Sequence, residues 1–260
     1  MKVAILSSAP ERYARLLHDL PDVEIAATAG WDAFEPVRRA AEAGARVLCE
    51  HPLAAKEADL KAMVDAGGDR LTFASPACHG EAFAVLRRGI ADGGIGELTT
   101  ILGSLTTRAD GGVLGATVPY LLDLADAVLD GDRAHQVYAQ TNTILGGQGA
   151  ESAAVVTIRY RSGKVASFDC GRSPSATGRP VVTFIGDKAS VQYDAGPRLL
   201  GGERPEPGGE DLDALMLRDF LSAEGGAGPD GQAALRTAGI VQAAYESAHT
   251  GQPVDLPPGG

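Results

Sequence analysis

The segment at residues 46–54, Arg-Val-Leu-Cys-Glu-His-Pro-Leu-Ala, sets the architecture of the chain. Residues 46–49 predict a short strand whose last three residues are buried, and His51-Pro52 ends it, because proline cannot donate to a β-ladder and disfavours the helical region for the residue before it. A helix is expected to follow at residues 56–66. In an open α/β sheet, ligands bind at the carboxyl ends of the strands, so Glu50 and His51 are predicted to lie on the rim of a site.

Strands and helices alternate on both sides of this segment, up to residue 96. Apolar, β-branched runs predict strands at residues 2–7, 23–28 and 71–74, whereas apolar residues at helical spacing predict helices at residues 11–20, 34–43 and 81–92. This alternation implies βαβ crossovers and a parallel sheet. We therefore expect a first α/β domain over residues 1–96.

After Gly96 the pattern changes to long strands, at residues 98–107, 136–143, 152–160, 164–170, 181–185 and 189–193. Hairpin turns at residues 161–164 and 186–188 predict an antiparallel or mixed sheet. Helices are expected at residues 118–129, where Thr117 opens the helix and Pro119 lies in its first turn, and at residues 212–222 and 233–250. Residues 196–209 are rich in glycine and proline and predict a loop. The second domain is thus expected over residues 97–260, as an α+β domain with a large, mostly antiparallel open sheet.

Composition restricts the class of protein. With 260 residues, 44% hydrophobic, the chain can bury a full core, and its net charge of -11 argues against nucleic acid as a partner. No apolar run approaches the length of a membrane span, so we expect no membrane association and a cytoplasmic protein. Cys49, Cys78 and Cys170 have no CxxC or CxxH spacing, which predicts reduced thiols and no metal site.

Four segments together carry a family resemblance. Residues 46–54 are similar to the Glu-Lys-Pro segment of the glucose-fructose oxidoreductase, inositol dehydrogenase and rhizopine-catabolism (Gfo/Idh/MocA) family, and Ile95-Gly96-Glu97 to that family's switch into its second domain. Residues 111–124, beginning Gly-Gly-Val-Leu, resemble its Gly-Gly motif and the helix that follows. Residues 243–254 resemble its closing helix and strand.

The resemblance implies a Rossmann-like domain followed by an α/β domain whose outer sheet face often forms oligomers. It also implies NAD(P)-dependent hydride transfer from a sugar or polyol. Here the Rossmann-like domain is shortened, because residues 21–29 align both with the approach to the family's ribose-binding acid and with a later strand that precedes the Glu-Lys-Pro segment. A deletion of about two βα units accounts for this, leaving four strands.

The cofactor motifs of the family are altered. Its Gly-x-Gly-x-x-Gly loop, which brings a pyrophosphate to a helix N-terminus, corresponds to Ser7-Ser8-Ala9-Pro10-Glu11-Arg12, without glycine. The ribose-binding acid falls near Gly30, and Asp32 is a weak substitute. We therefore expect no cofactor, with NAD or NADP as the alternative. The weak candidates for cofactor binding are Ser7, Ser8, Arg12 and Glu50, which could bind an anion, although such serines more often cap a helix.

The catalytic motifs of the family are altered as well. Its Glu-Lys-Pro lysine corresponds to His51, and its Asp-x-Gly-x-His motif to Ala116, Val118 and Tyr120, whereas Asp123 follows the pattern on the same helical face as Tyr120. His51 could act as a general base beside Glu50, with Tyr120 as a donor or acid, and these residues with Asp123 are the catalytic candidates. Alternatively, His51 and Tyr120 only fill the space of the missing residues.

Other residues have a structural and a functional interpretation. Cys78 and His79 follow the fourth strand, but neighbours on an extended strand point apart, which argues against a thiol-imidazole dyad. Asp123 and Asp126 share a helix but lack a third metal ligand, and Trp31 is either a core residue or a stacking surface.

Three functions remain open. The first is a divergent family member that acts on a small polar metabolite in a redox-neutral acid/base step, or supports a complete paralogue as a non-catalytic subunit. The second is an NAD(P)-dependent oxidoreductase of a sugar or cyclitol with atypical cofactor binding. The third is a ligand sensor or scaffold. In each case we expect a homo-oligomer, or a hetero-oligomer with a paralogue, formed through the C-terminal sheet.

Overall fold

The computed structural model describes residues 2–7, 10–18, 24–29, 34–51, 57–108, 112–145, 150–176, 178–194, 197–199, 210–222 and 228–257. The chain divides into two compact units, which are described separately. Unit 1 comprises Met1–His79 and Asp211–Ala238, and unit 2 comprises Gly80–Glu210 and Gly239–Gly260. The domain boundary expected at residue 96 stays a prediction. Helix α4 (Glu81–Ala91) belongs to the same compact unit as the large sheet.

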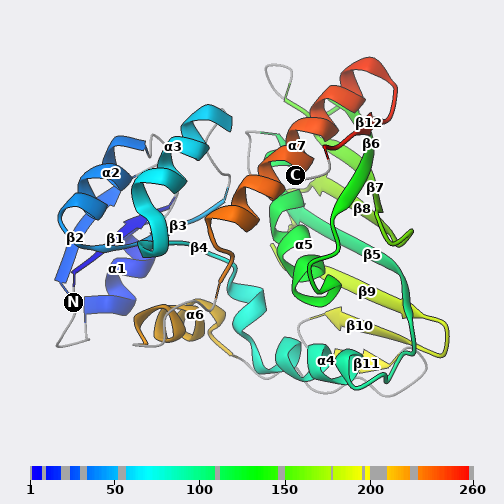
Figure 1. Ribbon diagram of the computed structural model, residues 1–260, viewed down its shortest axis with the longest axis horizontal. Coiled ribbons are helices and arrows are strands. Elements are labelled where there is room, and N and C mark those ends of the chain that lie inside the picture. Colours follow the sequence, from blue (N-terminus) through cyan, green and yellow to red (C-terminus); the bar gives the residue numbers. More distant parts are fainter. Residues whose placement is uncertain are drawn as a thin grey trace. The chain divides into compact units, whose positions relative to one another are not determined.

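Unit 1 is built on a four-stranded parallel sheet in the order β2-β1-β3-β4 (Figure 1). Its strands are β1 (Lys2–Leu6), β2 (Glu24–Ala29), β3 (Arg46–Cys49) and β4 (Leu71–Phe73). The helices between them are α1 (Pro10–His18), α2 (Phe34–Glu42) and α3 (Glu57–Gly67). The sheet confirms the short, parallel, Rossmann-like arrangement expected from the alternating pattern. Phe73 at the β4 edge donates its backbone N–H to the carbonyl of Pro229 (3.1 Å), so a distant segment satisfies part of that edge.

Alternate residues of β1 separate the two cores of unit 1, as the period of a strand requires. Ala4 and Leu6 pack with residues of α2 and α3, whereas Val3 and Ile5 pack with residues of α1 and of α6 (Leu212–Leu221). Figure 1 shows α1 and α6 on one side of the strands and α2 and α3 on the other. Helix α6 therefore covers the sheet beside α1, although it comes from the far end of the sequence.

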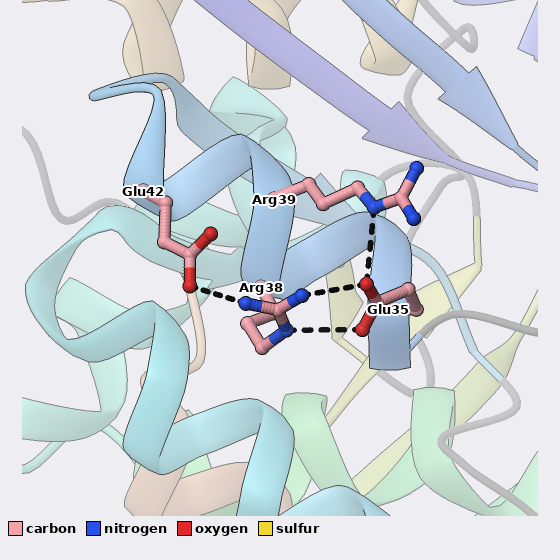
Figure 2. A network of polar contacts seen from close by, with 4 residues as sticks. All are labelled: Glu35, Arg38, Arg39 and Glu42. Atoms are coloured by element: carbon pink, nitrogen blue, oxygen red, sulfur yellow. Dashed lines mark hydrogen bonds and ion pairs between the residues drawn. The ribbon is translucent and has the colours of Figure 1, made fainter.

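The exposed side of α2 carries a charged network (Figure 2). Glu35, in the first turn, accepts hydrogen bonds from Arg38 and Arg39, and Arg38 also contacts Glu42. The hydrogen bonds from Arg38 and then Arg39 lower the pKa of Glu35 to about 2. These groups are exposed to solvent. The network therefore mainly gives this helix a polar outer side, with ion pairs at i, i+3 and i, i+4 spacing.

Unit 2 is built on an eight-stranded mixed sheet in the order β11-β10-β9-β5-β8-β7-β6-β12. All its pairs are antiparallel except the parallel pair of β5 and β8, which confirms the predicted open sheet. The bounds of the strands are β5 (Leu98–Thr107), β6 (Ala134–Asn142), β7 (Ala153–Tyr160), β8 (Val165–Arg172), β9 (Val181–Gly186), β10 (Ser190–Asp194), β11 (Pro197–Leu199) and β12 (Val254–Asp255). The prediction of a loop over residues 196–209 is wrong for Pro197–Leu199, which pair with β10. Residues 200–209 lie outside the described part of the chain.

One face of this sheet packs against helix α5 (Val113–Leu129). Helix α4 packs against β10 and β11, where Phe83 makes a T-shaped contact with Tyr193 of β10. Phe168 of β8 is fully buried beneath α5, where a side chain on Gly103 would meet it at 2.8 Å. The alternate residues point to the opposite face, and there Leu102 and Val155 are 45% and 48% exposed. The sheet thus has a packed face and an open face with apolar side chains. Helix α7 (Gly231–Thr250) precedes β12 in the chain. No helix of the described residues is long and apolar enough to cross a membrane.

Helix α5 begins at Val113, five residues before the predicted start, so the placement of Pro119 in the first turn is wrong. The start is determined by a contact with a distant residue: the Glu151 carboxylate accepts the backbone N–H of Leu114 (3.1 Å). Gly112 precedes the helix with φ 95°, and a Cβ there would lie 2.7 Å from the Glu151 carboxylate. A glycine of the Gly-Gly motif is therefore needed to bring this carboxylate onto the helix N-terminus.

Candidate functional site

Three segments that follow strands of unit 1 meet at the carboxyl edge of its parallel sheet. Ser7 follows β1, Glu50 and His51 follow β3, and residues 75–79 follow β4. Ser7 and His51 are buried, with 1% and 3% of their surface exposed. Because ligands of open α/β sheets bind at this edge, it is the candidate site of unit 1.

Glu50 is the centre of the first polar cluster on this edge. One of its carboxylate oxygens accepts the hydroxyl of Ser7, and the other accepts the hydroxyl of Tyr13 on α1. Ser7 and Glu50, both candidates for cofactor binding, are thus brought together. Tyr13 was missed as a polar partner, because its position in the apolar stripe of α1 assigned it to the core, and its ring is indeed buried.

Arg12 lies in the first turns of α1, and its guanidinium forms an ion pair with Asp213 of α6. Burial raises the pKa of Asp213 above its usual range; Arg12 opposes this shift, and the nearby carboxylates of Asp211 and Glu50 add to it. Asp211 caps α6 by accepting the backbone N–H of Ala214 at 3.1 Å. The start of α1 therefore faces carboxylates that nothing in the local sequence around Arg12 predicted.

The raised pKa of Asp213 leads to a stability prediction. Because the folded state favours the protonated carboxyl, ionised Asp213 destabilises the fold above the folded pKa, and this penalty disappears as the pH falls through that value. We expect Asp213→Asn to leave the free energy of unfolding at pH 7 unchanged or to raise it, although it removes an ion pair. Urea unfolding from pH 7 to about pH 4 measures this, with Asp211→Ala as the comparison variant, which removes the cap of α6 and should lower the stability. A clear loss of stability in Asp213→Asn at pH 7 would show that the ion pair outweighs burial.

The second polar cluster of this edge joins the segment after β4 to α6. Nδ1 of His79 lies 3.0 Å from the Asp219 carboxylate, and the His79 side chain is 3% exposed. The Ser75 hydroxyl donates to Sγ of Cys78 at 3.2 Å. The predicted absence of a Cys78–His79 dyad stays a prediction. The partner that the structure gives to His79 is a carboxylate 140 residues away, which sequence spacing could not indicate.

In unit 2 the catalytic candidates Tyr120 and Asp123 lie on α5, where Asp123 is buried and Tyr120 is half-buried. The start of this helix is closed by Glu151, which also accepts the hydroxyl of Tyr245 at 2.9 Å. Burial, followed by the charge of Glu151, raises the pKa of Tyr245 to about 12. No local pattern pointed to Glu151, because it lies between two strands and 37 residues from Leu114, whose N–H it accepts.

In the part of the chain that the structure describes, the remaining candidates show no arrangement suited to nucleophilic or metal chemistry. Cys49 and Cys170 are buried thiols, and burial raises their pKa values to about 12 and about 11, which makes them poor nucleophiles. Among the described residues, no group of three His, Cys, Asp or Glu side chains is placed to hold a metal ion. Ser8, Gly30, Trp31 and Asp32 lie outside the described residues.

The described donors at the start of α1 do not fit the pyrophosphate of a dinucleotide. A pyrophosphate needs free N–H and O–H donors and a net positive field at the helix N-terminus. Here the hydroxyls of Ser7 and Tyr13 are bound to Glu50, and the guanidinium of Arg12 is bound to Asp213. Two carboxylates thus share this place with one cation, so a dianion bound there would be repelled.

The chain was compared with known proteins. Residues 83–192 match the family model of the GFO/IDH/MocA C-terminal domain. The structure is similar to a myo-inositol dehydrogenase from Corynebacterium glutamicum and to a levoglucosan dehydrogenase in complex with NADH and L-sorbose, each 18% identical with a TM-score of 0.77 over 99% of both chains. It is also similar to GenD2 from gentamicin A biosynthesis in complex with NAD, at 17% identity and a TM-score of 0.81 over 99% of this chain and 96% of GenD2.

A search of curated proteins found no match. The structural likeness extends over both units, and the sequence match covers most of the large sheet and the helices α4 and α5. The resemblance expected from the sequence is confirmed: residues 83–192 match the model of the GFO/IDH/MocA C-terminal domain, and the fold is similar to that of inositol and sugar dehydrogenases.

Proposed function

We propose that this protein acts on a small polar metabolite without a nicotinamide bound in the manner of its dehydrogenase relatives. It either performs a redox-neutral acid/base step or supports a complete paralogue as a non-catalytic subunit. The observation that carries the proposal is the set of internal partners at the start of α1. Ser7 and Tyr13 donate to Glu50, and Arg12 pairs with Asp213, where a pyrophosphate would need these donors.

Acid/base chemistry without a hydride carrier requires only groups that accept and return a proton. In this proposal His51, at the carboxyl edge of the parallel sheet, is the base, and Tyr120 and Asp123 on α5 supply the acid and its partner. The burial of His51 and Asp123 supports the proposal, because desolvated groups interact more strongly with a bound ligand. We place this chemistry in the cytoplasm. Because the protein has a net charge of -11, we expect its metabolite to be uncharged or cationic.

The subunit role depends on the open face of the large sheet. Leu102 of β5 pairs with Ser167 of β8, and Val155 of β7 pairs with Asp169 of β8. In this proposal the apolar side chains of this face pack against a second sheet, and Asp169 needs a polar or cationic partner there. We propose that this face forms a homo-oligomer or a hetero-oligomer with a paralogue. The exposure of Leu102 and Val155 is what supports it.

The alternative is an NAD(P)-dependent oxidoreductase of a sugar or cyclitol that holds its cofactor atypically. The observation that favours it is the likeness, over nearly the whole chain, to structures that contain NAD or NADH. In this case the carboxylates of Glu50 and Asp213 would have to give up Ser7, Tyr13 and Arg12 when the dinucleotide binds.

The nucleotide content of the protein distinguishes the two functions. Protein purified rapidly from cells is denatured, and the supernatant is analysed for NAD(H) and NADP(H) by mass spectrometry, with protein to which NADH was added as the recovery control. We expect no dinucleotide at a stoichiometric level, and about one per chain would establish the alternative.

Complementation of a deletion strain separates catalysis from the subunit and sensor roles. If the protein is catalytic, the His51→Ala and Tyr120→Phe variants should fold but should fail to restore the wild-type phenotype to the deletion strain. Full restoration by both variants would rule out the acid/base step and leave a non-catalytic role.

A further inference from the structure

We propose that His79 is a hydrogen-bond and proton acceptor for a bound metabolite and that Asp219 is its positioning residue. This inference rests on the proposed acid/base function and adds a residue to it. The two side chains come from the segment after β4 and from α6, and both belong to unit 1.

The contact with Asp219 fixes the protonation of the ring. A carboxylate only accepts hydrogen bonds, so the 3.0 Å contact requires Nδ1 of His79 to carry a proton and donate it to Asp219. In the neutral imidazole, the other nitrogen, Nε2, then has a free lone pair. Asp219 therefore orients the ring and leaves Nε2 as an acceptor.

Nε2 of His79 is buried and has no hydrogen-bond partner among the described residues. A buried polar atom without a partner destabilises a fold, so such atoms are commonly paired with water or ligand. The atom lies in the segment that follows the carboxyl end of β4, on the edge where α/β sheets bind ligands. Its location and its lone pair together indicate a contact with a ligand that donates a hydrogen bond.

The surroundings define the class of that ligand. Asp219 lies at Nδ1, on the other side of the ring from Nε2, and unit 1 carries a second group of carboxylates, Glu50, Asp211 and Asp213, of which Asp213 is paired with Arg12. Arg218 contacts Asp219 at 3.5 Å but is exposed to solvent. An anionic ligand is therefore disfavoured, and an uncharged hydroxyl compound is the class that fits an acceptor nitrogen.

The proton transfer is balanced within the site. The O–H bond of the ligand breaks and its proton forms an N–H bond at Nε2, which leaves an alkoxide and an imidazolium. The imidazolium still donates Nδ1–H to the Asp219 carboxylate, whose charge stabilises it. Return of the proton from Nε2 to the oxygen restores the hydroxyl and the neutral ring, without any oxidant or reductant.

Nitrogen-15 NMR of the histidine rings tests the proposal on the full-length protein. The spectrum should show a protonated Nδ1 and an unprotonated Nε2 for His79, assigned by its loss in His79→Gln. Addition of myo-inositol or L-sorbose as a probe should shift the Nε2 resonance of His79 in the direction of hydrogen bonding. His135, a half-buried histidine of unit 2 whose buried Nδ1 has no partner among the described residues, is the control within the same chain and should not respond.

Asp219→Ala should mix the two ring tautomers and weaken the probe response at least about tenfold, since a preorganised hydrogen bond is lost. The neighbouring Arg218→Ala is the matched variant and should change neither. A proton on Nε2 in the native protein, or an Nε2 resonance that neither probe moves, would overturn the proposal. Both readouts are independent of dinucleotide content, so the two proposals can fail separately.

Discussion

Gly186→Ala is expected to destabilise unit 2 by about 3 kcal/mol or more. A Cβ at this position would lie 2.1 Å from the backbone carbonyl oxygen of Ile95, which no rotamer change can relieve. The end of β9 contacts the Ile95-Gly96-Glu97 segment here, where Glu97 donates its backbone N–H to Asp187 (2.8 Å) and Lys188 donates to the carbonyl of Ile95 (3.1 Å). The alanine would have to push these two segments apart.

The free energy of unfolding of Gly186→Ala, measured by urea titration, is compared with that of Gly89→Ala. Gly89 lies inside α4, and a Cβ added there would meet nothing within 4 Å, so this control should gain up to about 1 kcal/mol from helix propensity. Equal stabilities of the two variants would show that the close approach of Gly186 to Ile95 is not present in solution.

Tyr13→Phe is expected to lower the stability of the protein by about 1.5–3 kcal/mol, the range for a hydrogen bond to a charged group. The variant keeps the buried ring and removes only the hydroxyl that donates to Glu50. The carboxylate then retains the hydroxyl of Ser7 and loses one donor. Thermal or urea unfolding at pH 7 measures the change.

Tyr245→Phe is the matched control, because it removes the same type of contact, a phenol donating to the carboxylate of Glu151. Tyr245 is 43% exposed, so water can replace the lost donor and the change should stay below about 1 kcal/mol. A Tyr13→Phe variant as stable as Tyr245→Phe would mean that Glu50 does not depend on Tyr13.

The order and type of most elements could be predicted from the sequence, because periodicity of apolar residues is a local signal. The strand at Arg46–Cys49 and the ten-residue strand at Leu98–Thr107 have the predicted bounds. The start of α5 could not be predicted, since Glu151 and Gly112 define it and Pro119 pointed to a later start. The strand β11 was missed because its glycine- and proline-rich surroundings indicated a loop.

The candidate site was predictable only in part, for the same physical reason. Ser7, Glu50 and His51 follow strands, so the rule for α/β sheets places them on one edge. Their partners Asp213 and Asp219 come from α6, and no local pattern shows that this helix returns to the first sheet. Contacts between segments far apart in the sequence thus determine what the site can bind.

The most direct test of the central claim is a calorimetric titration of the purified protein with NADH and with NADPH. If the donors at the start of α1 are held by Glu50 and Asp213, neither dinucleotide should bind with a dissociation constant below about 100 μM, which corresponds to about 5.5 kcal/mol. A dissociation constant well below that value for either dinucleotide would contradict the claim and return the protein to the NAD(P)-dependent dehydrogenases.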